Sequence, residues 1–149
     1  MVTLGDRDWY WSAHLVCTHR ELLKALSCFT DQRRQLVLEG TTKAAAKLLI
    51  PISQEPNLKV KSGFVWFGKP KFIAVQMGQA SLDTLLQVEN EYFGPELFTH
   101  CMVITNSEVL MEAYDAGNGE VLFSPLLLTA QINDFASLMK VKVERQEVS

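Results

Sequence analysis

Apolar and polar side chains alternate along residues 59–77, on either side of a turn-forming stretch at residues 68–71. A period of two is that of a β-strand, and the β-branched and aromatic residues of this stretch suit a pleated sheet. The pattern predicts a β-hairpin in which Phe67 pairs with Phe72 across the turn. The opposite face of the hairpin from these two combines apolar side chains only, apart from Ser62: Val60, Phe64, Trp66, Ile73, Val75 and Met77.

The period of the apolar residues changes to about 3.6 after Gly78, which is that of an α-helix. A helix is predicted over residues 81–93, with Ser81 as its N-cap. Gly94 and Pro95 should end it, since glycine accepts the left-handed conformation and proline cannot donate a backbone hydrogen bond. The apolar stripe of this helix consists of Leu82, Leu85, Leu86, Tyr92 and Phe93.

An earlier helix is predicted over residues 18–29 from a local signal. Thr18 followed by Glu21 is the capping-box pattern, in which each side chain bonds the other residue's backbone N–H. The aromatic-rich residues 8–17 before this helix alternate, and they predict a strand.

The stretch between this helix and the hairpin shows weaker patterns. A strand over residues 33–39 and an alanine-rich helix over residues 43–49, capped by residues 40–42, are predicted. Ile50 precedes Pro51 and should therefore be extended. The polar, proline-containing residues 51–57 are typical of a mobile surface loop.

The C-terminal third predicts a β-meander over residues 100–128, because short apolar runs are separated by turn sequences. Residues 108–115 fit either a strand or a helix, and both alternatives stay open. A C-terminal helix through Met139 is predicted after the meander, with Thr129 or Asn133 as its N-cap.

These elements define an α+β fold in a single domain over residues 1–149. We expect a mostly antiparallel sheet of about five to seven strands, with the helices over 18–29 and 81–93 packed on one of its faces. A domain boundary near residues 51–57 would leave two pieces too small to be stable alone. The polar residues 144–149 are predicted to form a frayed tail.

Composition is that of an ordinary globular protein, with 48% hydrophobic residues and a net charge of -3. The slightly acidic balance argues against sequence-independent nucleic-acid binding by the whole surface. Cys17, Cys28 and Cys101 are odd in number and lie in apolar runs, which favours buried, reduced thiols. The sequence shows neither a signal-peptide pattern nor an apolar run long enough to cross a bilayer, so we expect an intracellular protein of the cytoplasm or nucleus, without membrane contact.

Histidine and cysteine residues are weak candidates for metal binding and catalysis. His14, Cys17 and His19 form H-x2-C-x-H, which matches no standard zinc pattern. His100 and Cys101 are adjacent in a predicted strand, so their side chains point to opposite faces and form no catalytic pair. The sequence therefore predicts no metal site and no cofactor, and it favours a non-catalytic role over that of an enzyme.

Aromatic residues are the stronger functional signal. Trp9, Tyr10 and Trp11 cannot all point to the same side of a strand, and exposed Trp and Tyr often anchor protein interfaces. Together with Phe67 and Phe72 of the hairpin, they are the predicted partner-binding residues. We expect a protein-binding module, such as a subunit, adaptor or inhibitor, whose partner is another protein or a second copy of the chain.

Two alternatives stay open. Lys59, Lys61, Lys69 and Lys71 lie beside the two phenylalanines of the hairpin, and cations next to aromatic platforms are what single-stranded nucleic acids bind. Lysines at a hairpin also deter strand edges from associating, which is the structural explanation for the same residues. The second alternative is a small enzyme whose catalytic residues converge only in the folded chain.

Overall fold

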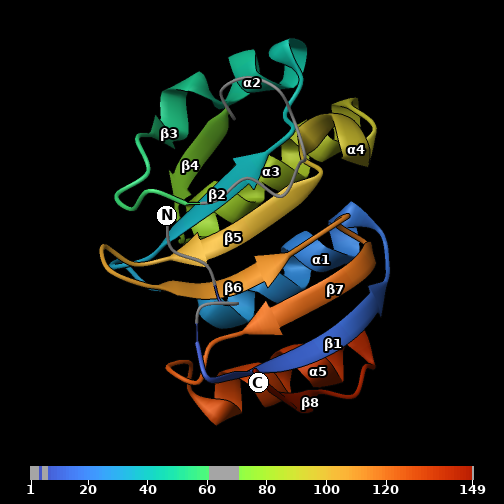
Figure 1. The fold of residues 1–149 in the computed structure, drawn as a ribbon. Coiled ribbons are helices and arrows are strands. Elements are labelled where there is room, and N and C mark those ends of the chain that lie inside the picture. Colours follow the sequence, from blue (N-terminus) through green and yellow to red (C-terminus); the bar gives the residue numbers. More distant parts are fainter. Residues whose placement is uncertain (1–3, 5–6, 61–70, 149) are drawn as a thin grey trace.

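The computed structural model describes residues 4, 7–60 and 71–148, and it shows one open sheet of eight strands with helices on one of its faces (Figure 1). Neighbouring strands are antiparallel, in the order β3-β4-β2-β5-β6-β7-β1-β8. The predicted α+β class is therefore confirmed. The strands are β1 (Trp9–Val16), β2 (Gln35–Glu39), β3 (Ser53–Gln54), β4 (Phe72–Gln76), β5 (His100–Ile104), β6 (Val109–Ala113), β7 (Asn118–Phe123) and β8 (Glu144–Glu147). The helices are α1 (His19–Ala25), α2 (Lys43–Leu49), α3 (Gln79–Glu91), α4 (Gly94–Leu97) and α5 (Thr129–Met139), with 3-10 turns η2 (Leu26–Phe29) and η3 (Ile50–Ile52).

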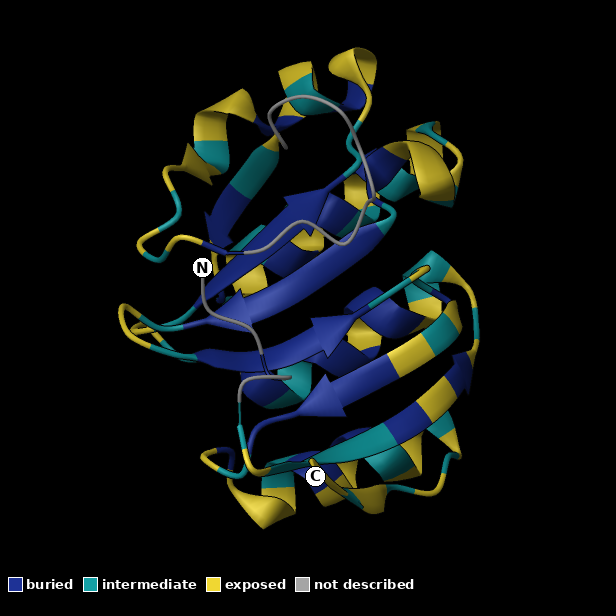
Figure 2. Ribbon diagram, viewed as in Figure 1, coloured by how far each residue is buried: buried dark blue, intermediate teal, exposed yellow. Residues whose placement is uncertain are grey.

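Both faces of the sheet carry apolar clusters. On the helix face, side chains such as Leu36, Val103 and Phe123 pack against residues from the helices. The second face carries a smaller cluster made of Leu4, Val37, Val60, Ala74, Met102, Ile104, Val109 and Leu122. The central strands β2, β5 and β6 are consequently buried along their whole length (Figure 2).

The capping box at the start of α1 forms as predicted. The Glu21 backbone N–H donates to Thr18 Oγ1 at 3.0 Å, and the Thr18 N–H donates to Glu21 Oε1 at 3.0 Å. Leu22 and Leu23 are completely buried, and η2 continues the same stretch to Phe29. The predicted helix over residues 18–29 is thus an α-helix followed by one 3-10 turn.

Helix α3 is confirmed, but both of its ends differ from the prediction. Gly78, and not Ser81, is the N-cap, so the cap lies three residues earlier than predicted. Tyr92 already has extended backbone angles, so Phe93 leaves the apolar stripe and is 75% exposed. Gly94 and Pro95 then open the short helix α4, where a proline in the first turn loses no hydrogen bond.

Strand β4 forms the second half of the predicted hairpin. Ile73, Val75 and Met77 pack on the helix face, as expected. Residues 61–70 of the predicted hairpin, and with them the pairing of Phe67 with Phe72, lie outside the described residues. Along Ala74 and Val75, β4 pairs with β2 on one edge and with β3 on the other. Val60 was expected to share the face of Ile73, but it packs in the cluster of the second face, which also holds Ala74.

Residues 50–57 contain more regular structure than a loop. Ile50 was expected to be extended but has helical angles, because η3 continues α2 and takes Pro51 into its first turn. Ser53 and Gln54 then form the short strand β3. The side chain of Gln35 fastens the following residues through bonds to Gln54 Oε1, Glu55 O and the Asn57 N–H.

The meander after residue 100 is confirmed, and its open question is resolved in favour of the strand. Residues 109–113 form β6 and not a helix. Strand β7 ends at Phe123, before Pro125. The tail was expected to be frayed, but residues 144–147 form β8 and pair with β1. This pairing with a distant strand gives the polar tail backbone partners that its own sequence does not reveal.

Candidate functional site

Strand β1 distributes its aromatic residues over both faces of the sheet. Trp9 and Trp11 lie on the helix face with their ring centroids 5.4 Å apart in an edge-to-face arrangement. Trp11 packs against the large cluster, whereas Tyr10 packs against the cluster of the second face. The Arg145 guanidinium lies 4.0 Å from the Trp9 ring centroid. All three aromatic residues are half-buried, so each presents only part of its ring to solvent.

Trp9 also lines a hollow of about 330 Å³ with Arg7, Asp8 and Pro125. A second hollow, of about 430 Å³, is lined by Leu126 with Leu110 and with polar residues of the turns at residues 31–34 and 105–108. The ion pair between Arg7 and Glu108 connects the two. We call the region formed by Trp9 and residues 125–128 the strand-end surface, because it lies where β1 begins and β7 has ended.

The strand-end surface exposes leucine side chains, and charged residues that line the two hollows form its rim. Leu126 and Leu128 are 56% and 66% exposed, while Leu127 between them is buried. On the rim, the Asp31 carboxylate accepts hydrogen bonds from the Arg33 side chain and backbone. These bonds and the guanidinium charge lower the pKa of Asp31 from 3.8 to about 2.

Among the described hairpin residues, the aromatic surface is less exposed than the sequence predicted. Phe72 was expected to be exposed, but it is half-buried and packs against the cluster of the second face. Lys59 and Lys71 are exposed. Phe67, Lys61 and Lys69 lie outside the described residues, so nucleic-acid binding through this face stays a prediction.

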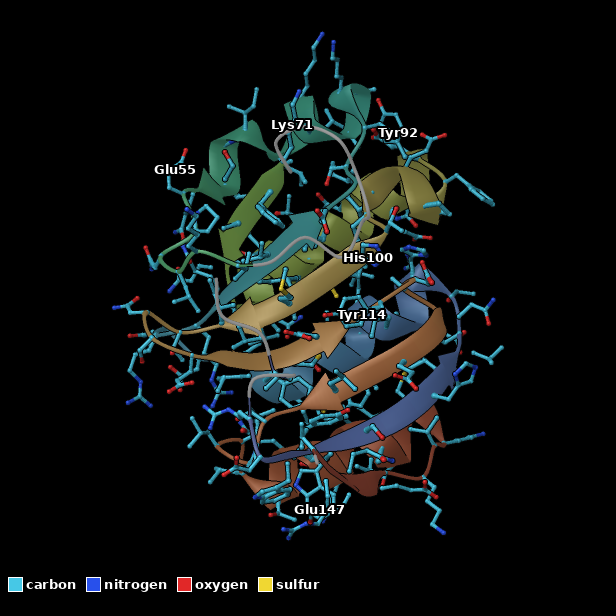
Figure 3. All side chains as sticks on the ribbon, viewed as in Figure 1. Glu55, Lys71, Tyr92, His100, Tyr114 and Glu147 are labelled. Atoms are coloured by element: carbon cyan, nitrogen blue, oxygen red, sulfur yellow. The ribbon has the colours of Figure 1, made fainter. Side chains whose placement is uncertain are left out.

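Sequence reasoning missed a row of buried polar residues on the second face. Glu39 on β2 is directly opposite His100 on β5, and both are almost completely buried. The rings of His100 and Tyr114 lie against each other with centroids 5.6 Å apart (Figure 3). Tyr114 in turn donates a 2.6 Å hydrogen bond to Glu112 Oε2. One sequence signal could have revealed this row. Its polar residues lie in strands, and the residues two positions away, which share their face, are apolar.

The hydrogen bonds of this row fasten backbone segments to the sheet. Glu112 Oε1 accepts a 2.9 Å bond from the Leu4 backbone N–H, which holds Leu4 in the cluster of the second face. His100 Nδ1 accepts a 3.0 Å bond from the Asp115 N–H, which fixes the turn between β6 and β7. Side chains of these types can serve as general acids and bases. Here, however, the hydrogen bonds of His100 and Glu112 hold backbone segments in place, which is a structural role.

Among the other histidines and cysteines, Cys17 and Cys101 lie near enough to interact electrostatically, whereas His14 and His19 lie in different surroundings. His14 is exposed on β1, His19 Nε2 lies 2.8 Å from the Phe98 carbonyl oxygen, and Cys101 is in the core. Burial raises the pKa of Cys101 to about 12, and burial with the nearby Glu21 charge raises the pKa of Cys17 to about 11. Across residues 7–60 and 71–148, no three His, Cys, Asp or Glu side chains are placed to hold a metal ion.

Comparisons with known proteins identify no relative: no family model, no curated protein and no solved structure matches this chain. None of the helices within the described ranges has the length and hydropathy needed to cross a bilayer.

Proposed function

We propose that this chain is a non-catalytic protein-binding module that holds its partner through the strand-end surface. The observation that carries the proposal is the position of Trp9, which lines a hollow with Pro125 immediately before the exposed Leu126 and Leu128. A partly exposed tryptophan beside Pro125, with exposed leucines one and three residues further along the chain, offers more apolar surface than a single scattered side chain.

The composition of this surface fits a protein partner. Interfaces combine an apolar centre rich in aromatic residues with a polar rim, and arginine is enriched in them. Here Arg7 and Arg33 lie on the rim, each paired with a carboxylate. Those pairs hold the arginines in position, so less side-chain entropy is lost when a partner binds.

The chemistry of the remaining residues supports binding over catalysis. The pKa of both Cys17 and Cys101 lies far above neutral, which leaves their thiols protonated and poorly nucleophilic. His14, His19 and His100 lie in separate surroundings, and Nδ1 of His100 accepts a backbone hydrogen bond. The three free cysteines support the further proposal that the protein works in the reducing cytoplasm or nucleus.

The test is co-purification from native cells with the unaltered chain and with two matched variants. Leu126→Asp puts a charge at the centre of the strand-end surface and should remove the partner. Leu138→Asp makes the same change at a site on α5 that is 61% exposed, and it should retain the partner. Loss of the partner in both variants, or in neither, would contradict the proposed surface.

A second variant separates binding from folding. Trp9→Ala should weaken partner capture at least about tenfold while the circular-dichroism spectrum stays unchanged, because Trp9 is a partly exposed anchor. Trp11→Ala should instead lower stability, since Trp11 packs against the large cluster. A Trp9→Ala protein that unfolds would show that Trp9 is a core residue.

A further inference from the structure

We propose that the edge of β8 binds a second copy of this chain, so that two sheets join into one across a two-fold axis at Gln146. Strand β8 lies at the end of the strand order and pairs with β1 along one edge only, among the described residues. Its other edge carries backbone groups that a further strand can satisfy.

The backbone determines which residues of β8 face outward. The Val148 N–H donates a 2.8 Å hydrogen bond to the Asp8 carbonyl, so Val148 faces β1. In an antiparallel ladder, successive residues face the two neighbouring strands alternately. Glu144 and Gln146 therefore also face β1, whereas Arg145 and Glu147 present their N–H and C=O groups to the outside.

These two outward residues restrict how a second β8 can pair with the first. In an antiparallel pair, outward residues must lie opposite outward residues, which leaves three registers within β8. Arg145 opposite Arg145, and Glu147 opposite Glu147, each set like charges against each other. The third register places Arg145 opposite Glu147 of the second copy, and symmetry repeats this pair with the roles exchanged. Opposite charges directly across a strand pair are stabilising and like charges are destabilising.

The favoured register also suits the side chains within one copy. Arg145 Nε already donates a 2.6 Å hydrogen bond to Glu147 Oε1, and the Arg145 guanidinium lies over the Trp9 ring. The two copies would then form a square of four alternating charges in which every charge has two opposite neighbours. Such networks are more stabilising than isolated surface ion pairs.

The opposite rim of the sheet is less suited to pairing. Strand β3 has two residues, and Pro51 and Pro56 lie close to its ends. Prolines and short lengths are typical features of edges that do not accept a further strand. The inferred interface uses the backbone of residues 144–148 and meets the strand-end surface only where Arg145 lies over Trp9. The two proposals are tested apart, because Leu126→Asp leaves β8 unchanged.

Sedimentation equilibrium over a range of concentrations tests the charge pattern. We expect a monomer–dimer equilibrium for the unaltered chain and a dimer weakened about tenfold or more by Glu147→Arg or by Arg145→Glu, because each change sets like charges opposite each other in every register. The double exchange Arg145→Glu/Glu147→Arg should restore the dimer. A chain that stays monomeric at millimolar concentration, or a dimer that tolerates both single changes, would overturn the inference.

A disulfide experiment tests the register. Gln146 lies opposite itself across the two-fold axis in a pair without backbone bonds, where Cα atoms are about 4.5 Å apart, close enough for a disulfide. Gln146→Cys should therefore cross-link rapidly under mild oxidation, in a chain with Cys17 and Cys28 changed to serine. Glu144→Cys in the same chain is the matched control, because it lies two residues from the axis. Equal cross-linking by both would contradict this register.

Amide hydrogen exchange reports directly on the backbone. The Arg145 and Glu147 amides should become protected as concentration rises, while the Val148 amide should be protected in monomer and dimer alike. The Val148 amide also shows whether a charge variant keeps β8 paired with β1. Dimerisation without any change at Arg145 and Glu147 would place the interface elsewhere and overturn the inference.

Discussion

Gly117 shows how a single residue fixes the junction between two strands. Its φ angle is 89°, in the left-handed region that glycine adopts readily. A Cβ atom added there would lie 2.3 Å from the Cys17 carbonyl oxygen, which is far inside contact distance. The Gly117 carbonyl also accepts a 2.6 Å hydrogen bond from the Cys17 N–H, so this close approach joins the end of β1 to the start of β7.

We therefore expect Gly117→Ala to lower the free energy of unfolding by about 2 kcal/mol or more, through backbone strain and the forced separation from Cys17. Urea denaturation measures this change. Gly78→Ala is the matched control because no atom lies within 4 Å of its added Cβ, and it should cost less than about 1 kcal/mol. Equal losses in the two variants would contradict the role given to Gly117.

The carboxyl group of Asp31 gives a prediction about pH. Its pKa is lowered to about 2 by the Arg33 side chain and backbone, so the folded protein binds this proton less tightly than the unfolded chain, whose pKa is 3.8. The resulting stabilisation is present above pH 3.8 and is lost as the pH falls towards 2. Arg33→Gln should move the pKa part of the way back to 3.8, since the backbone N–H still donates. NMR titration of the carboxyl carbon measures both values, and a midpoint near 3.8 in the unaltered chain would refute the contact.

Among the elements, those with local signals were predictable and those made by distant partners were not. The capping box of α1 lies within four residues, and the period of α3 identified that helix although not its ends. Strand β8 is polar, and only its pairing with β1 makes it a strand. The same limit applied to the candidate site. The alternation of β1 correctly placed Trp9 and Trp11 on one face. The contact of Arg145 with Trp9 could not be predicted, because Arg145 lies far along the chain.

Helix caps provide a prediction at this scale. Thr18→Ala removes the side chain that bonds the Glu21 N–H, and it should lower the free energy of unfolding by about 1 kcal/mol. Thr129 was a candidate cap for the C-terminal helix, but Leu128 is the N-cap there and no side chain bonds the backbone. Thr129→Ala should therefore have almost no effect in the same thermal or urea unfolding experiment. A larger loss at Thr129 than at Thr18 would reverse this assignment.

At the scale of the whole molecule, the central strands β2, β5 and β6 are buried on both faces, whereas the sequence predicted helices on one face and assigned no cover to the other. Glu39 and Glu112 lie on this second face and are almost completely buried, which their charged side chains did not suggest. Their burial depends on segments held against the sheet by hydrogen bonds, as Leu4 is by Glu112. The row through His100 could not be predicted because its members come from three strands whose register no local pattern specifies.

A substitution at Leu4 tests the packing of the cluster on the second face. Leu4 is completely buried although it lies close to the N-terminal end of the described residues, so Leu4→Ala should lower the free energy of unfolding by about 2–5 kcal/mol. Leu138→Ala removes the same atoms from a side chain that is 61% exposed, and it should cost less than about 0.5 kcal/mol. Chemical denaturation of the two variants measures both changes. Similar small decreases in the free energy of unfolding would show that Leu4 is not packed against the second face.

The two neighbours of β1 have a consequence for how the chain is made. Trp11 pairs with Phe123 and Trp9 with Glu147, so β1 is synthesised before the other described strands of this sheet but receives both of its partners last. Until then its tryptophans have no sheet to join, and a half-synthesised chain exposes them to other nascent chains. We expect the sheet to close only after residue 147 has been synthesised, so β1 stays without its strand partners while the strands between are made.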